Sequence, residues 1–280
     1  MNPPRLFVGV GSGRCGTMAI ANALAAEPGV ICTHEGKLRH GETPGAQLLR
    51  FMTLDNRLAY ETPAAADEIF ARVRGEFTRV AAESGAAWFG DIAYNYAPFL
   101  DALTRQLPQA RLFVLVRNGV DFVRSAAQAV GEDPTPVGWA PRGKPLSPVE
   151  RYVELGRLAP RAQDPLAARW ESLDHVARNA WLWAETNRLI FDAVAHRAAG
   201  MTLVLRFEDF FRDPAAAYPA LRSFVGLPEP APAAALATFR RPINSREARL
   251  GPYAEWTPSQ RAAFDEFAGP MMLRLAYRPD

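Results

Sequence analysis

The stretch "LFVGVGSGRCGTMAIANAL", residues 6–24, begins as an apolar segment, continues as a glycine-rich segment and ends rich in alanine and leucine. This order predicts a buried strand over residues 6–10, a loop over 11–16 and a helix over 17–26. A helix that begins directly after a glycine loop presents free backbone N–H groups and the positive end of its dipole, so it can bind an anion. A tight turn that binds nothing would show the same order of elements. The stretch therefore indicates an anion site but does not identify the anion.

The remainder of the chain alternates between strand and helix patterns. We predict further strands at residues 30–33, 86–92, 111–116 and 201–206, and further helices at 65–83, 98–107, 120–130, 171–198 and 259–277. The segment "RLFVLV", residues 111–116, is continuously apolar, as is typical of a parallel strand covered on both faces. The alternation predicts an α/β fold, a three-layer parallel sheet with helices on both faces, in a single domain over residues 1–280.

Two segments fit no element of this pattern. Residues 36–64 are irregular, and residues 131–168 are rich in proline and glycine. Both are too long to be simple connections, so we predict that they are insertions that form a lid or the acceptor side of a site.

Composition excludes several classes of function. The net charge is only +2, which does not indicate a nucleic-acid-binding surface. Cys15 and Cys32 are too few for a disulfide framework or a four-ligand zinc site, so we expect a reducing, cytoplasmic environment. No segment approaches the 18 apolar residues of a membrane span. The oligomeric state is not indicated by any pattern in the sequence.

The glycine loop fits two nucleotide motifs to different degrees. Residues 11–16, "GSGRCG", match the dinucleotide fingerprint G-x-G-x-x-G, and Glu35 follows at the distance expected of a ribose anchor. Arg14 has no use inside the pyrophosphate turn of such a site. The mononucleotide P-loop needs a lysine between Gly16 and Thr17, and none is present, so we do not predict cleavage of a nucleoside triphosphate. An NAD(P)-dependent oxidoreductase remains an alternative on this loop alone.

The sequence "RCGT", residues 14–17, resembles the P-loop-like 5′-phosphosulfate loop of the sulfotransferase family, with Cys15 in place of the usual serine and Met18 in place of a frequent threonine. A second segment, "RLFVLVRNGVDFVRSA", residues 111–126, resembles the family's strand that ends in arginine and is followed by a helical serine. The resemblance implies that Arg117 and Ser125 bind the 3′-phosphate of the donor. It assigns the 5′ side of the donor to Gly13, Arg14, Cys15, Gly16, Thr17 and Met18.

Two later segments resemble the same family. Residues 203–228 are similar to a strand–helix–Gly-Leu-Pro segment, in which Phe207 takes the place of a tyrosine near the adenine. Residues 245–256, "SREARLGPYAEW", are similar to a basic loop that covers the 3′-phosphate, and Arg249 and Gly251 are the candidates there.

The resemblance implies sulfuryl transfer from 3′-phosphoadenosine 5′-phosphosulfate (PAPS) to a hydroxyl, less readily an amine, of a carbohydrate or small-molecule acceptor. The product is 3′-phosphoadenosine 5′-phosphate (PAP), and no metal is needed. Such a reaction requires a base and positive charge on the transferring group. We assign the base to Glu35, at the position of a catalytic glutamate in several carbohydrate- and tyrosine-modifying sulfotransferases, with His34 as the alternative. Arg14 would supply charge. A non-catalytic nucleotide-binding protein remains a second alternative.

Overall fold

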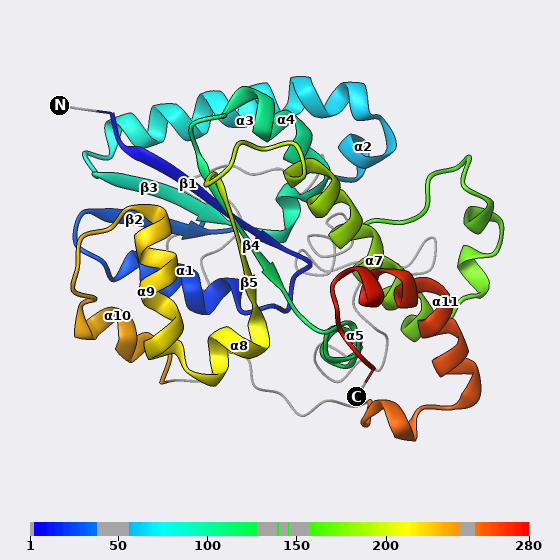
Figure 1. Cartoon of the computed structure of the whole chain (residues 1–280). Coiled ribbons are helices and arrows are strands. Elements are labelled where there is room, and N and C mark those ends of the chain that lie inside the picture. The colour runs from blue at the N-terminus through cyan, green and yellow to red at the C-terminus, as the bar shows by residue number, and fades with distance from the viewer. Residues whose placement is uncertain are drawn as a thin grey trace.

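The computed structural model describes residues 3–37, 56–127, 139, 145, 157–240 and 250–279. Within these ranges, five parallel strands form one sheet in the order β2-β3-β1-β4-β5 (Figure 1). The strands are β1 (Arg5–Gly11), β2 (Val30–His34), β3 (Trp88–Ile92), β4 (Arg111–Val116) and β5 (Thr202–Arg206). The central strand β1 is thus flanked by β3 and β4.

The register brings the carboxyl ends of the strands to one edge of the sheet. Gly11 at the end of β1 pairs with Leu115 near the end of β4, and His34 at the end of β2 pairs with Ile92 at the end of β3. Ligands of open α/β sheets bind outside this carboxyl edge. The segments that leave β1, β2, β3 and β4 are therefore the ones that can build a site.

Helices cover both faces of the sheet, which confirms the predicted three-layer α/β fold. One face packs against α1 (Thr17–Ala25), α8 (Phe207–Arg212), α9 (Pro214–Val225) and α10 (Ala233–Thr238). The other face packs against α2 (Asn56–Glu61), α3 (Pro63–Glu83), α4 (Leu100–Gln106), α5 (Gly119–Ala126), α7 (His175–Val194) and α11 (Pro258–Arg274). Figure 1 shows α1, α9 and α10 on one side and α3 and α4 on the other.

The sequence-based elements differ from the structure in four places. Part of the segment 36–64, predicted to be irregular, forms α2 and the first turn of α3, and its residues 38–55 lie outside the described ranges. The helix α8 follows β5 directly, and neither α8 nor α10 is among the predicted helices. A 3₁₀ helix, Tyr94–Phe99, precedes α4. Most of the segment 131–168 lies outside the described ranges, so its role as a lid and the single-domain assignment stay predictions.

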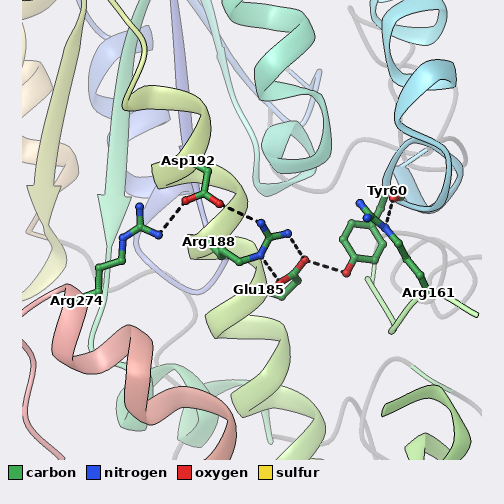
Figure 2. A network of polar contacts seen from close by, with 6 residues as sticks. All are labelled: Tyr60, Arg161, Glu185, Arg188, Asp192 and Arg274. Atoms are coloured by element: carbon green, nitrogen blue, oxygen red, sulfur yellow. Dashed lines mark hydrogen bonds and ion pairs between the residues drawn. The ribbon is translucent and has the colours of Figure 1, made fainter. Parts of the chain in front are cut away.

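Polar contacts connect α2, α7 and α11 on the surface. Figure 2 shows this network, which consists of Tyr60, Arg161, Glu185, Arg188, Asp192 and Arg274. The Tyr60 hydroxyl donates to Glu185 Oε1 at 2.9 Å, and Arg274 reaches Asp192 at 2.9 Å. Arg188 joins the two carboxylates. Because most of these charged side chains are about half exposed, each ion pair contributes little to stability.

An ion pair between α9 and Glu27, two residues after the end of α1, is buried instead. Arg222 Nε lies 2.7 Å from Glu27 Oε1, and the two side chains are 1% and 2% exposed. The Tyr218 hydroxyl donates to the same Glu27 oxygen at 2.9 Å. Arg222 also bonds Glu229 at 2.9 Å. Removing one partner of such a pair strands a buried charge, which costs far more than breaking a surface pair.

We predict that Arg222→Met lowers the free energy of unfolding by about 3–5 kcal/mol, because Glu27 stays buried without its cation. Urea unfolding followed by circular dichroism measures the change. The matched control is Arg57→Met, which breaks the half-exposed Arg57–Glu61 pair and should cost less than about 1 kcal/mol. A loss below that value for Arg222→Met would contradict the prediction.

Candidate active site

The loop between β1 and α1 is built from left-handed residues. Gly13, Arg14 and Gly16 have φ values of 82°, 55° and 81°. Such a run turns successive backbone N–H groups toward one side, where they form a concave anion site. Gly16 is the N-cap residue of α1 and carries no side chain that could accept from the first N–H groups of the helix. No side chain at the N-cap position therefore competes with an external acceptor for the first N–H groups of the helix.

Two close approaches require glycine at the ends of this loop. A Cβ atom at Gly16 would overlap the Phe211 ring of α8, and one at Gly11 would overlap the Cys15 sulfur. Phe211 in turn packs against Phe207 with a tilted ring, and the ring centroids lie 4.7 Å apart. The loop is thus packed against the aromatic side chains of α8 on one side and against β4 on the other.

Arg117, the first residue after β4, contacts the loop directly. Its Nη1 donates to the carbonyl oxygen of Arg14 at 2.6 Å, and its guanidinium carbon lies 4.3 Å from the centroid of the Phe207 ring. Its own carbonyl accepts from Trp183 Nε1 at 3.0 Å. Burial lowers the pKa of Arg117, but the guanidinium stays charged at neutral pH. A partly buried cation so placed favours an anion at the edge of the sheet.

The side chain of Arg14 extends to α5, where its Nε donates to Ser125 Oγ at 3.0 Å. The structure therefore brings together four side chains that the sequence analysis selected from separate segments, namely Arg14, Arg117, Ser125 and Phe207. Their contacts are observed, whereas their roles toward a donor stay predictions.

The two candidate bases lie on one turn at the end of β2. His34 Nε2 lies 3.0 Å from Thr17 Oγ1 at the start of α1. Glu35 has a left-handed φ of 53°, and its N–H donates to the carbonyl oxygen of Ile92 at 3.1 Å. Burial raises the pKa of Tyr94, and the negative charge of Glu35 raises it further. Tyr94 packs beside Gly13. His34 thus contacts α1, while Glu35 lies near Tyr94 on the loop's other side.

The other residues predicted to contact the donor differ in how exposed they are and in where they lie. The Cys15 thiol is fully buried, so any contact with a donor must come from its backbone. Met18 is half-buried on α1. The Gly251 carbonyl accepts from Trp256 Nε1 at 2.8 Å, and Arg124, the residue before Ser125, donates to the carbonyl of Leu250 at 3.2 Å. Arg249 lies outside the described residues.

Two residues of the carboxyl edge were missed by the sequence analysis. Asp91 lies within β3 and is fully buried, and Tyr94 follows two residues after that strand. Both occur in "GDIAYNYAP", residues 90–98. Asp91 could have been found as a charged residue inside an apolar strand pattern. Such a residue is easily mistaken for the start of a loop.

The described ranges lack two further features. There, no cluster of three or more His, Cys, Asp and Glu residues could hold a metal ion. None of the helices resolved in those ranges is both long and apolar enough to cross a membrane.

The fold and the loop define a parallel α/β protein with a P-loop-like glycine turn after its central strand. A family model described as "Sulfotransferase family" matches residues 4–231. The chain belongs to the sulfotransferase family. No curated protein matches the chain significantly.

Solved structures with this fold include three sulfotransferases. Sulfotransferase STF9 from Mycobacterium avium is 11% identical, with a TM-score of 0.56, and the match covers 99% of this chain and 78% of that one. Sulfotransferase STF1 from Mycobacterium tuberculosis H37Rv is 16% identical, with a TM-score of 0.53 and coverages of 95% and 77%. The sulfotransferase domain from the curacin biosynthetic pathway is 12% identical, with a TM-score of 0.51 over 100% of both chains. At these identities the likeness is one of fold.

The strand order also bears on the dinucleotide alternative. In dinucleotide-binding folds β2 lies directly beside β1, which places the acidic residue at its end next to the glycine loop. Here β3 lies between β1 and β2. Glu35 is thus one strand farther from the loop than a ribose anchor would be. Family membership and strand order both argue against the oxidoreductase.

We predict that neither thiol reacts with a disulfide reagent in the folded protein at pH 8. Burial raises the pKa of Cys15 to about 12 and also raises that of Cys32, so both stay protonated and inaccessible. The measurement is thiol titration with and without denaturant, and both thiols should react only in denaturant. Rapid native reaction that Cys15→Ser abolishes would show that the Cys15 side chain faces the site.

Proposed function

We propose that the protein transfers the sulfuryl group of PAPS to a hydroxyl of a carbohydrate or small-molecule acceptor and releases PAP. Family membership supports sulfuryl transfer in general. The observation that carries the choice of donor is the position of Arg117, which bonds the glycine loop and stacks on Phe207. A guanidinium between a phosphate-binding loop and an aromatic ring suits a nucleotide that carries a second phosphate.

The donor would span the distance between the loop and α5. The loop amides and the N-terminus of α1 receive the phosphosulfate, and Arg117 and Ser125 receive the 3′-phosphate. The adenine lies by Phe207, and Gly251 and Arg249 close over the 3′ side. In this arrangement the donor replaces the hydrogen bond between Arg14 and Ser125, which frees Arg14 for the transferring group.

The reaction is an in-line displacement at sulfur. The acceptor oxygen forms a bond to sulfur as the bond between sulfur and the 5′-phosphate oxygen breaks, and PAP leaves with that electron pair. Glu35 takes the acceptor proton, and Arg14 with the loop amides stabilises the charge that develops on the sulfuryl and phosphate oxygens. We place this activity in the cytoplasm, because Cys15 and Cys32 are both free thiols.

Binding of the donor product tests the first half of this proposal. PAP at 100 times its Kd should stabilise the fold by about 2.7 kcal/mol in a thermal-shift experiment, whereas NAD⁺, NADP⁺ and ATP should give smaller shifts. We predict that Arg117→Ala weakens PAP binding at least about tenfold, because a hydrogen bond to a charged group contributes about 1.5–3 kcal/mol.

The matched control for this variant is Arg105→Ala, which removes an exposed arginine on α4 and should leave the PAP shift unchanged. A wild-type protein that ignores PAP, or that prefers NAD⁺, would contradict the proposed donor.

A second prediction concerns the base. Glu35→Gln should leave the Kd for PAP within about twofold and lower kcat by about 10²–10⁴-fold, because it removes proton abstraction and little else. PAP release from PAPS with a panel of sugars and phenols provides the assay. His34→Gln is the comparison, and its kcat should fall much less.

The opposite ranking of the two variants would assign the base to His34. A wild-type protein that binds PAP tightly but never releases it from PAPS with any acceptor would support the non-catalytic alternative.

A further inference from the structure

The turn that carries both candidate bases is a tight two-residue turn. His34 and Lys37 exchange backbone hydrogen bonds of 2.9 and 3.0 Å, with Glu35 and Gly36 between them. These two residues have φ values of 53° and 75°, so both central positions are left-handed, as in a type I′ turn. A left-handed residue other than glycine costs about 1–2 kcal/mol, so Glu35 needs contacts that hold it there.

Asp91 supplies one of these contacts from the neighbouring strand. It lies on β3 with 0% exposure, and its Oδ1 accepts from the Gly36 N–H at 2.9 Å and from Thr33 Oγ1 at 2.6 Å. The Glu35 N–H is held by the carbonyl of Ile92, the last residue of the same strand. The two central amides of the turn are therefore both bonded to β3.

A buried carboxylate at this position is costly to the fold. The pKa of Asp91 is raised to about 6, chiefly by burial. The groups that face it are Thr33 and Cys32 on β2, Tyr96 after β3, and Glu35 with Gly36 on the turn. Because the folded pKa lies above the unfolded value of 3.8, the stability falls as the pH rises from about 4 to about 6 and stays lower above that range. The position therefore carries a cost that core packing alone does not explain.

We propose that Asp91 is a positioning residue, which fixes the turn of residues 34–37 through the Gly36 amide and so holds the Glu35 carboxylate at the carboxyl edge of the sheet. Asp91 is buried and does not touch the acceptor itself. An ionised oxygen that accepts two hydrogen bonds binds both donors more strongly than a neutral one would. The catalytic consequence rests on the proposed function of Glu35, whereas the structural consequence does not.

Three variants test this inference. Asp91→Val keeps a strand-forming side chain and removes the acceptor, Asp91→Asn keeps an acceptor oxygen without the charge, and Thr33→Val removes only the strand-side donor. Two readouts are needed, namely hydrogen exchange of the Gly36 amide and a comparison of kcat with the Kd for PAP.

We expect Asp91→Val to speed exchange of the Gly36 amide at least about tenfold and to lower kcat by a similar factor, with the Kd for PAP within about twofold. In Asp91→Asn, the exchange rate of the Gly36 amide and kcat should both be close to the wild-type values. Thr33→Val should change each by less than about threefold. Unchanged Gly36 exchange in Asp91→Val would overturn the inference, as would a kcat that falls only in proportion to PAP binding.

If Asp91→Val does not fold, Asp91→Asn carries the test through its pH dependence. Protection of the Gly36 amide, corrected for intrinsic exchange, should rise through about pH 6 in the wild type and stay flat in the variant. Flat protection in both proteins would overturn the inference. A wild type without sulfuryl transfer would refute the proposed function alone, because the exchange measurements still decide whether Asp91 holds the turn.

Discussion

The parallel pairing of β1 with β4 is the constraint on which the site depends. Gly11 pairs with Leu115, so the two strands end at the same level. The residues that follow them, about 100 positions apart in the chain, therefore leave the sheet side by side. Arg117 can donate to the Arg14 carbonyl only because of this register. A shift along the ladder would separate the glycine loop from Arg117.

The segment that follows β4 is also held by a hydrogen bond to α8. The Asn118 N–H donates to Glu208 Oε1 at 2.7 Å, and the Tyr277 hydroxyl donates to the other oxygen of the same carboxylate at 2.8 Å. Glu208, at the start of α8, thus connects Asn118 with Tyr277, which lies beyond the end of α11. Asn118, the residue after Arg117, and Glu208, the residue after Phe207, are thus bonded to each other, which holds Arg117 beside Phe207. The Arg117 guanidinium therefore already has a fixed position in the absence of a ligand, so its positive charge is preorganised.

The sequence was informative where one local signal determines the structure. The apolar run that became β4 has a single stable position in a covered sheet, and the glycines of the loop are required by left-handed φ values and close approaches. The short helices α2, α8 and α10 were missed because six residues have little helical preference of their own and depend on packing. The strand order was equally invisible, because alternating strands and helices do not show that β3 lies between β1 and β2.

That strand order changes the role that can be assigned to Glu35. On a strand beside β1 its carboxylate would lie at the loop, where a ribose anchor belongs. With β3 between, its backbone instead bonds Ile92 and its turn bonds Asp91, both on β3. A strained, left-handed glutamate held by two contacts of a neighbouring strand is a position that the surrounding structure over-determines, as is common at functional sites. Asp91 was overlooked for the same reason, because its partner Gly36 lies 55 residues away and is brought close only by the sheet.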